Sequence, residues 1–240
     1  MKQYLTIFIL FLLGSTSTYA QFFDDSKIPQ TDNLVMAGKK AITLLGTQVN
    51  IGEKAPDFTV VNENFTPVQL SDFNNHIILI SVVPSLDTGV CSLQTKRFNE
   101  EVTNFSKDVV MLTISNDLPF AQKRFCKVEN IDKLKVLSDS VWRDFGSKYG
   151  LLIKDMGLLT RAIFIIDKQG NITYKELVAN ISNHPNYDKA LAALGELSKM
   201  KLESPKGAEQ TKQPGDQQVN HKIKSLAQPL TKNASLSASK

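Results

Sequence analysis

Residues 76–115 decide the fold of this chain, and they read HIILISVVPSLDTGVCSLQTKRFNEEVTNFSKDVVMLTIS. The apolar runs at the two ends of this stretch are typical of strands that are buried on both faces. Between them, residues 91–107 are expected to form an amphipathic helix, because apolar side chains recur at i, i+4 and i+7, namely at Phe98, Val102 and Phe105. A strand, a helix and a strand in this order predict parallel pairing with a right-handed crossover.

The sequence on either side extends this unit. Upstream, we expect two short β-hairpins, one at 41–50 that turns at Gly46 and one at 58–70. The downstream elements are expected to be a helix capped by Asp117, a strand at 134–137, a helix at 141–149, a strand at 161–167 with its hairpin partner at 172–177, and a helix at 187–200. This order predicts an α/β, thioredoxin-like fold with N-terminal β-hairpin additions.

The composition is that of a globular protein with unusual ends. Of 240 residues, 42% are hydrophobic and 22% are charged, and the chain has no second long apolar run, which excludes a multi-span membrane protein. Three His and two Cys are too few for a His-rich or Cys-rich zinc module. We expect neither a metal nor a bound cofactor. Residues 1–20 contribute +1 and residues 201–240 contribute +4 to a net charge of +4, which leaves −1 on the rest. A nearly neutral body argues against nucleic-acid binding.

The first twenty residues match a secretory signal peptide. Lys2 is followed by an apolar run from Tyr4 to Leu13 and by small residues that end at Ala20. The run is too short to span a bilayer comfortably. We therefore expect export, to the periplasm, with cleavage after Ala20 and no stable membrane insertion. An uncleaved N-terminal anchor is the alternative.

The remaining chain is expected to contain one domain. Residues 21–34 are expected to be a linker and residues 35–200 the thioredoxin-like domain. Residues 201–240 are rich in Lys, Gln and Ser and lack aromatic residues, so this tail cannot bury enough apolar surface to become ordered. The alternative to a solvated extension is a basic tail that binds a wall, a membrane or a partner.

A candidate site lies where the first buried strand ends. The strand stops at Pro84, and Cys91 follows at the start of the expected helix. A Cys in the first turn of a helix meets unpaired N–H groups and the positive end of the dipole, which favour thiolate over thiol. Thr88 can direct its hydroxyl towards whatever the sulfur meets, and Pro84 can screen one side. Arg161 begins an apolar strand whose end can approach the Cys91 helix. Such groups suit the polarisation of an O–O bond.

Other interpretations of these residues stay open at this point. Arg161 could be a strand-end charge in solvent, and Cys91 could be a small buried hydrophobe. Cys91 could also form a structural disulfide with Cys126, as exported proteins often do, in a non-enzymatic domain with a binding tail. No C-x-x-C is present, so a thioredoxin-type dithiol site is excluded.

Two cysteine-bearing motifs resemble those of a known family. Residues 84–91, PSLDTGVC, fit the peroxiredoxin pattern P-x-x-x-T-x-x-C, and the form S-x-D-T-G-V-C is similar to that of bacterial thiol peroxidases. Residues 115–126, SNDLPFAQKRFC, resemble the S-x-D-L-P-F-A-Q-x-R-F-C of the same subfamily. Further matches are GEKAPDF at 52–58 and TRA at 160–162. The chain departs from the family at 178–181, where VANI replaces an acidic V-D-E-I, and in its signal peptide and tail.

This resemblance implies an atypical two-Cys peroxiredoxin. Cys91 would be the peroxidatic thiolate and Cys126 the resolving thiol of the same chain, so that each turnover ends in an intramolecular disulfide. Thr88 would bind the peroxide, Arg161 would stabilise the thiolate and the peroxide, and Pro84 would shield the sulfenic acid. The resemblance further implies a homodimer, hydrogen peroxide and alkyl hydroperoxides as substrates, and a thioredoxin-like reductant.

Overall fold

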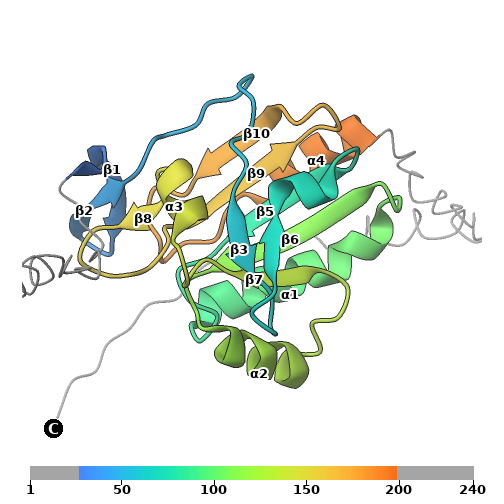
Figure 1. The fold of residues 1–240 in the computed structure, drawn as a ribbon, viewed down its shortest axis with the longest axis horizontal. Helices are drawn as coiled ribbons and strands as arrows, with labels where there is room; N and C mark the ends of the chain where they lie inside the picture. The colour runs from blue at the N-terminus through green and yellow to red at the C-terminus, as the bar shows by residue number, and fades with distance from the viewer. Residues whose placement is uncertain (1–26, 199–240) are drawn as a thin grey trace, which may run out of the picture. The chain divides into compact units, whose positions relative to one another are not determined.

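The structure is a computed structural model that describes residues 27–198. Its central sheet has seven strands in the order β10-β9-β5-β6-β7-β3-β4 (Figure 1). The strands are β3 (Thr59–Val61), β4 (Pro67–Gln69), β5 (Ile77–Val82), β6 (Val109–Ser115), β7 (Lys135–Ser138), β9 (Ala162–Ile166) and β10 (Ile172–Leu177). β5, β6 and β7 pair in parallel, whereas β9 pairs antiparallel with β5 and β10. The predicted α/β, thioredoxin-like architecture is confirmed.

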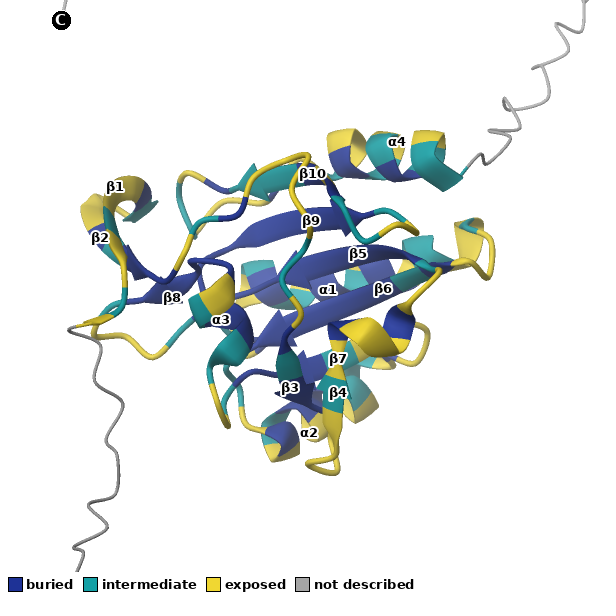
Figure 2. Ribbon diagram, turned by 45° about the horizontal axis from the view of Figure 1, so that its top comes forward, coloured by how far each residue is buried: buried dark blue, intermediate teal, exposed yellow. Residues whose placement is uncertain are grey.

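Alternation along the central strands divides the apolar core into two layers. Leu79 of β5 belongs to a layer that includes Phe98 of helix α1 (Gly89–Glu101) and Leu194 of helix α4 (Tyr187–Ser198). Its neighbour Ile80 belongs to the opposite layer, which includes Tyr149 after the short helix α3 (Asp144–Lys148). Figure 2 shows β5, β6 and β9 buried along almost their whole length, because helices and loops cover both faces. A strand buried on both faces provides a rigid support for the loop that follows it.

The N-terminal hairpin differs from the one predicted. Strand β2 (Lys40–Leu45) pairs with the preceding strand β1 (Gln30–Ala37) and with β8 (Leu152–Ile153), in a separate three-stranded sheet. The prediction of a hairpin over 41–50 that turns at Gly46 is therefore wrong. Gly46 instead permits a close approach, because it has a φ of +112° and a Cβ there would lie 2.1 Å from the Ser147 carbonyl oxygen. The first half of β1 is polar and half of its residues are exposed, so it lacks the apolar alternation that reveals a strand. Residues 30–34 belong to this strand rather than to a linker.

Other elements match the predictions with shifted ends. The β3–β4 hairpin is confirmed, and so is the β9–β10 hairpin. α1 stops at Glu101 and continues as a 3-10 turn at Val102–Asn104, so it is shorter than the helix predicted over 91–107. No helix among residues 27–198 is long and apolar enough to cross a membrane. The signal peptide with its cleavage site after Ala20 and the tail at 201–240 lie outside the described residues.

Candidate active site

The loop between β5 and α1 places a sulfur at a helix N-terminus. Cys91 is the third residue of α1, it is fully buried, and Thr88 is the N-cap residue of the helix. Thr88 does not cap the helix with its side chain. Its hydroxyl lies 2.8 Å from Cys91 Sγ and 3.1 Å from the Ser85 carbonyl oxygen, so its single proton is directed to one of these two acceptors. Pro84 is buried at the start of the same loop. The predicted juxtaposition of Thr88 and Cys91 is present.

Arg161 completes the surroundings of the sulfur. It directly precedes β9, is only 1% exposed, and donates from Nη2 to Cys91 Sγ at 3.2 Å. The interpretation of Arg161 as a solvated strand-end charge is therefore wrong. No carboxylate of residues 27–198 forms an ion pair with it. The guanidinium is permanently charged, and Cys91 Sγ is one of the few acceptors that it reaches inside the protein.

Two groups that the sequence analysis missed fix the direction of Arg161. Gln94 accepts from Nη1 at 2.6 Å and donates from Nε2 to Ser81 of β5 at 2.8 Å. The Ile181 carbonyl oxygen accepts from Nε at 3.0 Å and from Nη2 at 2.8 Å. The segment that carries this carbonyl is itself bound by β1, since Ile181 N–H donates to the Met36 carbonyl. Gln94 lies one helical turn beyond Cys91 on the same face of α1, and that spacing is the signal that could have revealed it.

Asp117 has another role than the predicted helix cap. Helix α2 (Pro119–Glu129) has Leu118 at its N-cap position and no side-chain cap. The Asp117 carboxylate accepts instead from the Ser85 hydroxyl and the Leu86 N–H of the Cys91 loop, both at 2.8 Å. The side chain therefore faces the site rather than its own helix. Nothing in the local sequence shows this, because the partner lies on another loop.

Cys126 lies on α2 and packs against the apolar layer that contains Cys91, but it forms no disulfide with Cys91. Both cysteines are free thiols, and Cys126 is half-buried. A structural Cys91–Cys126 disulfide is therefore not part of this structure. Burial, together with the nearby Glu63 carboxylate, raises the pKa of the Cys126 thiol to about 11. In this conformation Cys126 is therefore protonated at neutral pH.

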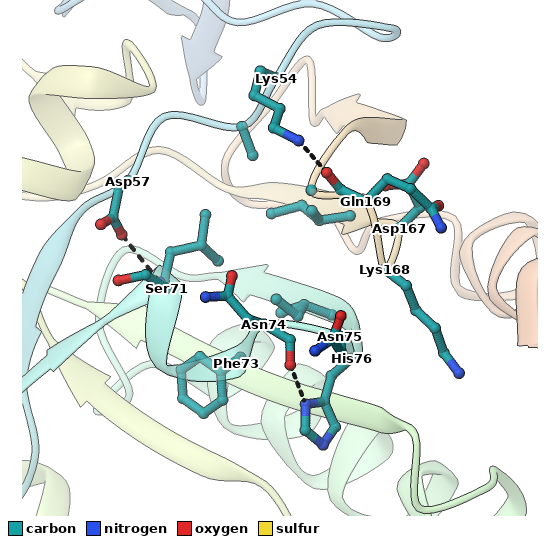
Figure 3. Close-up of a pocket in the computed structure, with 15 residues that line it drawn as sticks. Lys54, Asp57, Ser71, Phe73, Asn74, Asn75, His76, Asp167, Lys168 and Gln169 are labelled. Atoms are coloured by element: carbon teal, nitrogen blue, oxygen red, sulfur yellow. Dashed lines mark hydrogen bonds between the residues drawn. The ribbon is translucent and has the colours of Figure 1, made fainter.

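Two hollows on the surface differ in their relation to the sulfur. A groove of about 290 Å³ runs beside Thr88 and has Leu86, Phe125 and Val128 among its lining residues. A cavity of about 410 Å³ lies at the opposite end of β5, and Figure 3 shows its labelled polar side chains. There Lys54 donates to the Gln169 carbonyl, and none of the predicted site residues lines the cavity. Of these two hollows, the groove is the one that borders Thr88.

Comparisons with known proteins agree with the geometry. A model of the Redoxin family matches residues 50–191. A thiol peroxidase of Oceanobacillus iheyensis is 50% identical over 153 residues, which are 64% of this chain and 93% of that protein. A thiol peroxidase of Bacillus subtilis is 46% identical over 158 residues, which are 66% of this chain and 94% of that one. The chain belongs to the thiol peroxidases of the peroxiredoxin superfamily.

Solved structures support the same assignment. A peroxiredoxin-like protein of Aquifex aeolicus has 39% identity and a TM-score of 0.65, over 71% of this chain and 98% of that one. A thiol peroxidase of Chromobacterium violaceum, at 23% identity and a TM-score of 0.61, shares the fold. As a thiol peroxidase, the protein is an enzyme that reduces peroxides with thiol chemistry. The non-enzymatic alternative is not favoured. Among residues 27–198, no group of three or more His, Cys, Asp and Glu side chains could hold a metal.

Proposed function

We propose that the peroxidase reaction begins at Cys91, and the observation that carries this proposal is the pair of donors at its sulfur. Thr88 Oγ1 lies 2.8 Å and Arg161 Nη2 lies 3.2 Å from Cys91 Sγ. The Cys91 thiolate attacks one oxygen of the hydroperoxide, the O–O bond breaks, and the sulfur becomes a sulfenic acid. The other oxygen takes up a proton and leaves as an alcohol, or as water from hydrogen peroxide.

The two donors also suit the substrate oxygens. A buried guanidinium favours the negative charge that moves from sulfur to the leaving oxygen, because few water molecules screen it. The Thr88 hydroxyl can donate to a peroxide oxygen and accept from its O–H. Pro84, buried at the start of the loop, has no N–H and would shield the sulfenic acid on its side.

The groove beside Thr88 supports alkyl hydroperoxides as substrates in addition to hydrogen peroxide. Its apolar lining residues, Leu86, Phe125 and Val128, offer an alkyl chain a surface away from water. Hydrogen peroxide needs no such surface. We therefore expect alkyl hydroperoxides to be reduced faster than hydrogen peroxide at equal concentration.

We propose that Cys126 resolves the sulfenic acid. The Cys126 thiolate attacks the Cys91 sulfur, a disulfide forms and the sulfenic oxygen leaves as water. This step needs local opening, since a disulfide requires Cα atoms within about 7 Å. Opening would also expose Cys126 and relieve the burial that raises its pKa to about 11. An external dithiol, which we propose to be a thioredoxin-like protein, then reduces the disulfide.

Two serine variants test this function. Cys91→Ser should abolish peroxide consumption with dithiothreitol as the reductant, since an unactivated hydroxyl is a poor nucleophile. Without a reductant, Cys126→Ser should consume one equivalent of peroxide and accumulate the sulfenic acid, which mass spectrometry detects. Steady-state turnover by Cys91→Ser would refute the proposed nucleophile. Cys126→Ser cannot form the intramolecular disulfide, so steady-state turnover of this variant at the wild-type rate with a thioredoxin as the reductant would refute the resolving role.

Export and dimerisation are further proposals. We propose that the signal peptide directs the protein to the periplasm and that the mature chain begins at Gln21. N-terminal sequencing that reads Met1 would instead favour the anchor. A homodimer is supported by exposed apolar side chains on and beside α2, including Leu118 at 59% and Phe120 at 68% exposure. Light scattering of the purified protein distinguishes a dimer from a monomer.

A further inference from the structure

Asp117 links the loop before α1 to the segment before α2. One carboxylate oxygen accepts from the Ser85 hydroxyl, and the other accepts from the Leu86 N–H and the Ser115 hydroxyl, all three at 2.8 Å. Ser115 also accepts from Gln122 of α2, at 3.0 Å. We call Ser85, Leu86, Ser115, Asp117 and Gln122 the Asp117 network.

On one side, the network reaches the peroxidatic sulfur in two steps. The Ser85 carbonyl accepts from the Thr88 N–H at 3.1 Å and faces the Thr88 hydroxyl at the same distance. The Thr88 hydroxyl in turn lies 2.8 Å from Cys91 Sγ. The position of Ser85 therefore sets the position of the hydroxyl at the sulfur, although Asp117 itself does not touch Cys91.

On the other side, the network anchors the helix that carries Cys126. Gln122 is fully buried and donates to the Leu137 carbonyl of β7 as well as to Ser115. Cys126 lies one turn further along the same helix face. The Asp117 carbonyl also accepts from Ser138 of β7, at 2.6 Å. One short segment thus holds the resolving helix against the sheet and the peroxidatic loop in place.

We propose that Asp117 is a positioning residue that holds the peroxide-reducing conformation and restrains the opening that disulfide formation needs. This inference rests on the proposed resolving role of Cys126. Peroxide reduction requires Thr88 beside the Cys91 sulfur, whereas resolution requires the Cys91 loop, the Cys126 helix or both to move. Asp117 bonds directly to the Cys91 loop and reaches the Cys126 helix through Ser115, which accepts from Gln122. Weakening the contacts of its carboxylate therefore loosens the loop directly and the helix through Ser115.

Asp117→Asn tests the proposal, because the amide keeps the shape of the side chain and replaces one acceptor with a donor. The second-order reaction of Cys91 with hydrogen peroxide should fall by about tenfold, since a small displacement of Thr88 misplaces its hydroxyl. The first-order formation of the disulfide should rise by about threefold or more, since the open conformation becomes more populated. A second peroxide should also convert less of the sulfenic acid to sulfinic acid, because resolution competes better.

The two rates are separated in a single-turnover experiment. Reduced protein is mixed with hydrogen peroxide, quenched with a thiol-alkylating reagent at successive times, and the sulfenic and disulfide species are quantified by mass spectrometry. Asp188→Asn makes the same chemical change on the exposed surface of α4 and should leave both rates unchanged. A purely structural role would lower both rates together with the melting temperature, and that result would overturn the proposal.

Ser85→Ala provides a second variant that removes a single hydrogen bond of the network. It should change the two rates in the same opposite directions as Asp117→Asn, by smaller factors. In the double variant the factors should not multiply, because both changes remove the same contact. Multiplying factors, or unchanged rates in both single variants, would overturn the proposal. A wild-type protein that forms no Cys91–Cys126 disulfide at all would instead refute the proposed resolution step.

Discussion

Replacing Arg161 by Met should slow peroxide reduction severely while leaving the fold intact. The Arg161 side chain is 1% exposed and donates to three acceptors, which are Cys91 Sγ, Gln94 Oε1 and the Ile181 carbonyl. Met fills a similar volume but removes the charge and every donor. Loss of one buried donor to a developing anion typically costs about 2.7–4 kcal/mol, so we expect the second-order rate constant to fall about 10²–10³-fold.

The same substitution has a separate cost in stability. The Ile181 carbonyl and the Gln94 amide oxygen lose their donor while they stay inside the protein, and each such group costs about 1–3 kcal/mol. Arg161→Lys should be intermediate in rate, because one ammonium on a shorter stem cannot serve Cys91, Gln94 and Ile181 together. The rate and the melting temperature therefore report on different contacts of one side chain.

The rate is measured by rapid mixing of the reduced protein with hydrogen peroxide over a range of pH. Arg97→Met is the matched control, because this arginine forms an exposed i,i+4 ion pair with Glu101 on α1. Such pairs contribute little, so the control should react like the wild type. If Arg161→Met reacted within threefold of the wild type at neutral pH, the guanidinium would have no part in the reaction at the sulfur.

Three further predictions follow from other parts of the structure. Burial raises the pKa of the Asp139 carboxyl to about 7, although the N–H groups of residues 145 and 146 oppose the shift. Because the folded state binds the Asp139 proton more tightly than the unfolded state does, protonation stabilises the fold fully below about pH 4, and this contribution is lost as the pH rises through about 7. Asp139→Asn should therefore flatten the pH dependence of the unfolding free energy between these values, as measured by denaturant titration. Gly46→Ala should destabilise the fold by about 2 kcal/mol or more, because its Cβ would overlap the Ser147 carbonyl. Gly38→Ala should cost only about 1 kcal/mol, because Gly38 has a positive φ but open space around it. Equal losses of melting temperature in the two variants would contradict this prediction. Amide hydrogen exchange should show weaker protection at 88–96, at 118–130 or at both in the oxidised protein than in the reduced one, and identical protection would argue against local opening.

The sequence predicts the central sheet well, because its strands are buried on both faces and their apolar runs record that burial. β5, β6 and β9 are such strands. The sequence does not reveal β1, because half of its residues are exposed and its partner strand fixes its place. Local spacing indicated Thr88 and Cys91, since both lie on the same turn at the start of α1. Local spacing therefore predicts buried strands and neighbouring residues of one turn, but not an exposed strand whose place depends on its partner.

Contacts between distant segments could not be predicted in the same way. The sequence does not decide whether Arg161 lies in solvent or in the site, because only the folded sheet shows that it is buried against the Cys91 sulfur. An Asp just before a helix predicts a cap, whereas the Asp117 carboxylate bonds to the loop around Ser85. The Ile181 carbonyl was invisible as a site group, because a backbone oxygen has no signature in the sequence.

The contact between β1 and the segment around Ile181 determines when the surroundings of Arg161 are completed during folding. A nascent chain that ends at residue 177 already contains Cys91, Thr88 and Arg161, but it lacks the carbonyl that turns the guanidinium towards the sulfur. The Met36 carbonyl lies near the start of the domain and accepts from the Ile181 N–H, so this bond can form only after residue 181 has been synthesised. Because a domain folds as a unit, the contacts around Arg161 are completed only when this late segment joins β1. An incomplete chain therefore lacks the carbonyl that directs Arg161 towards Cys91, the contact on which our proposed reaction depends.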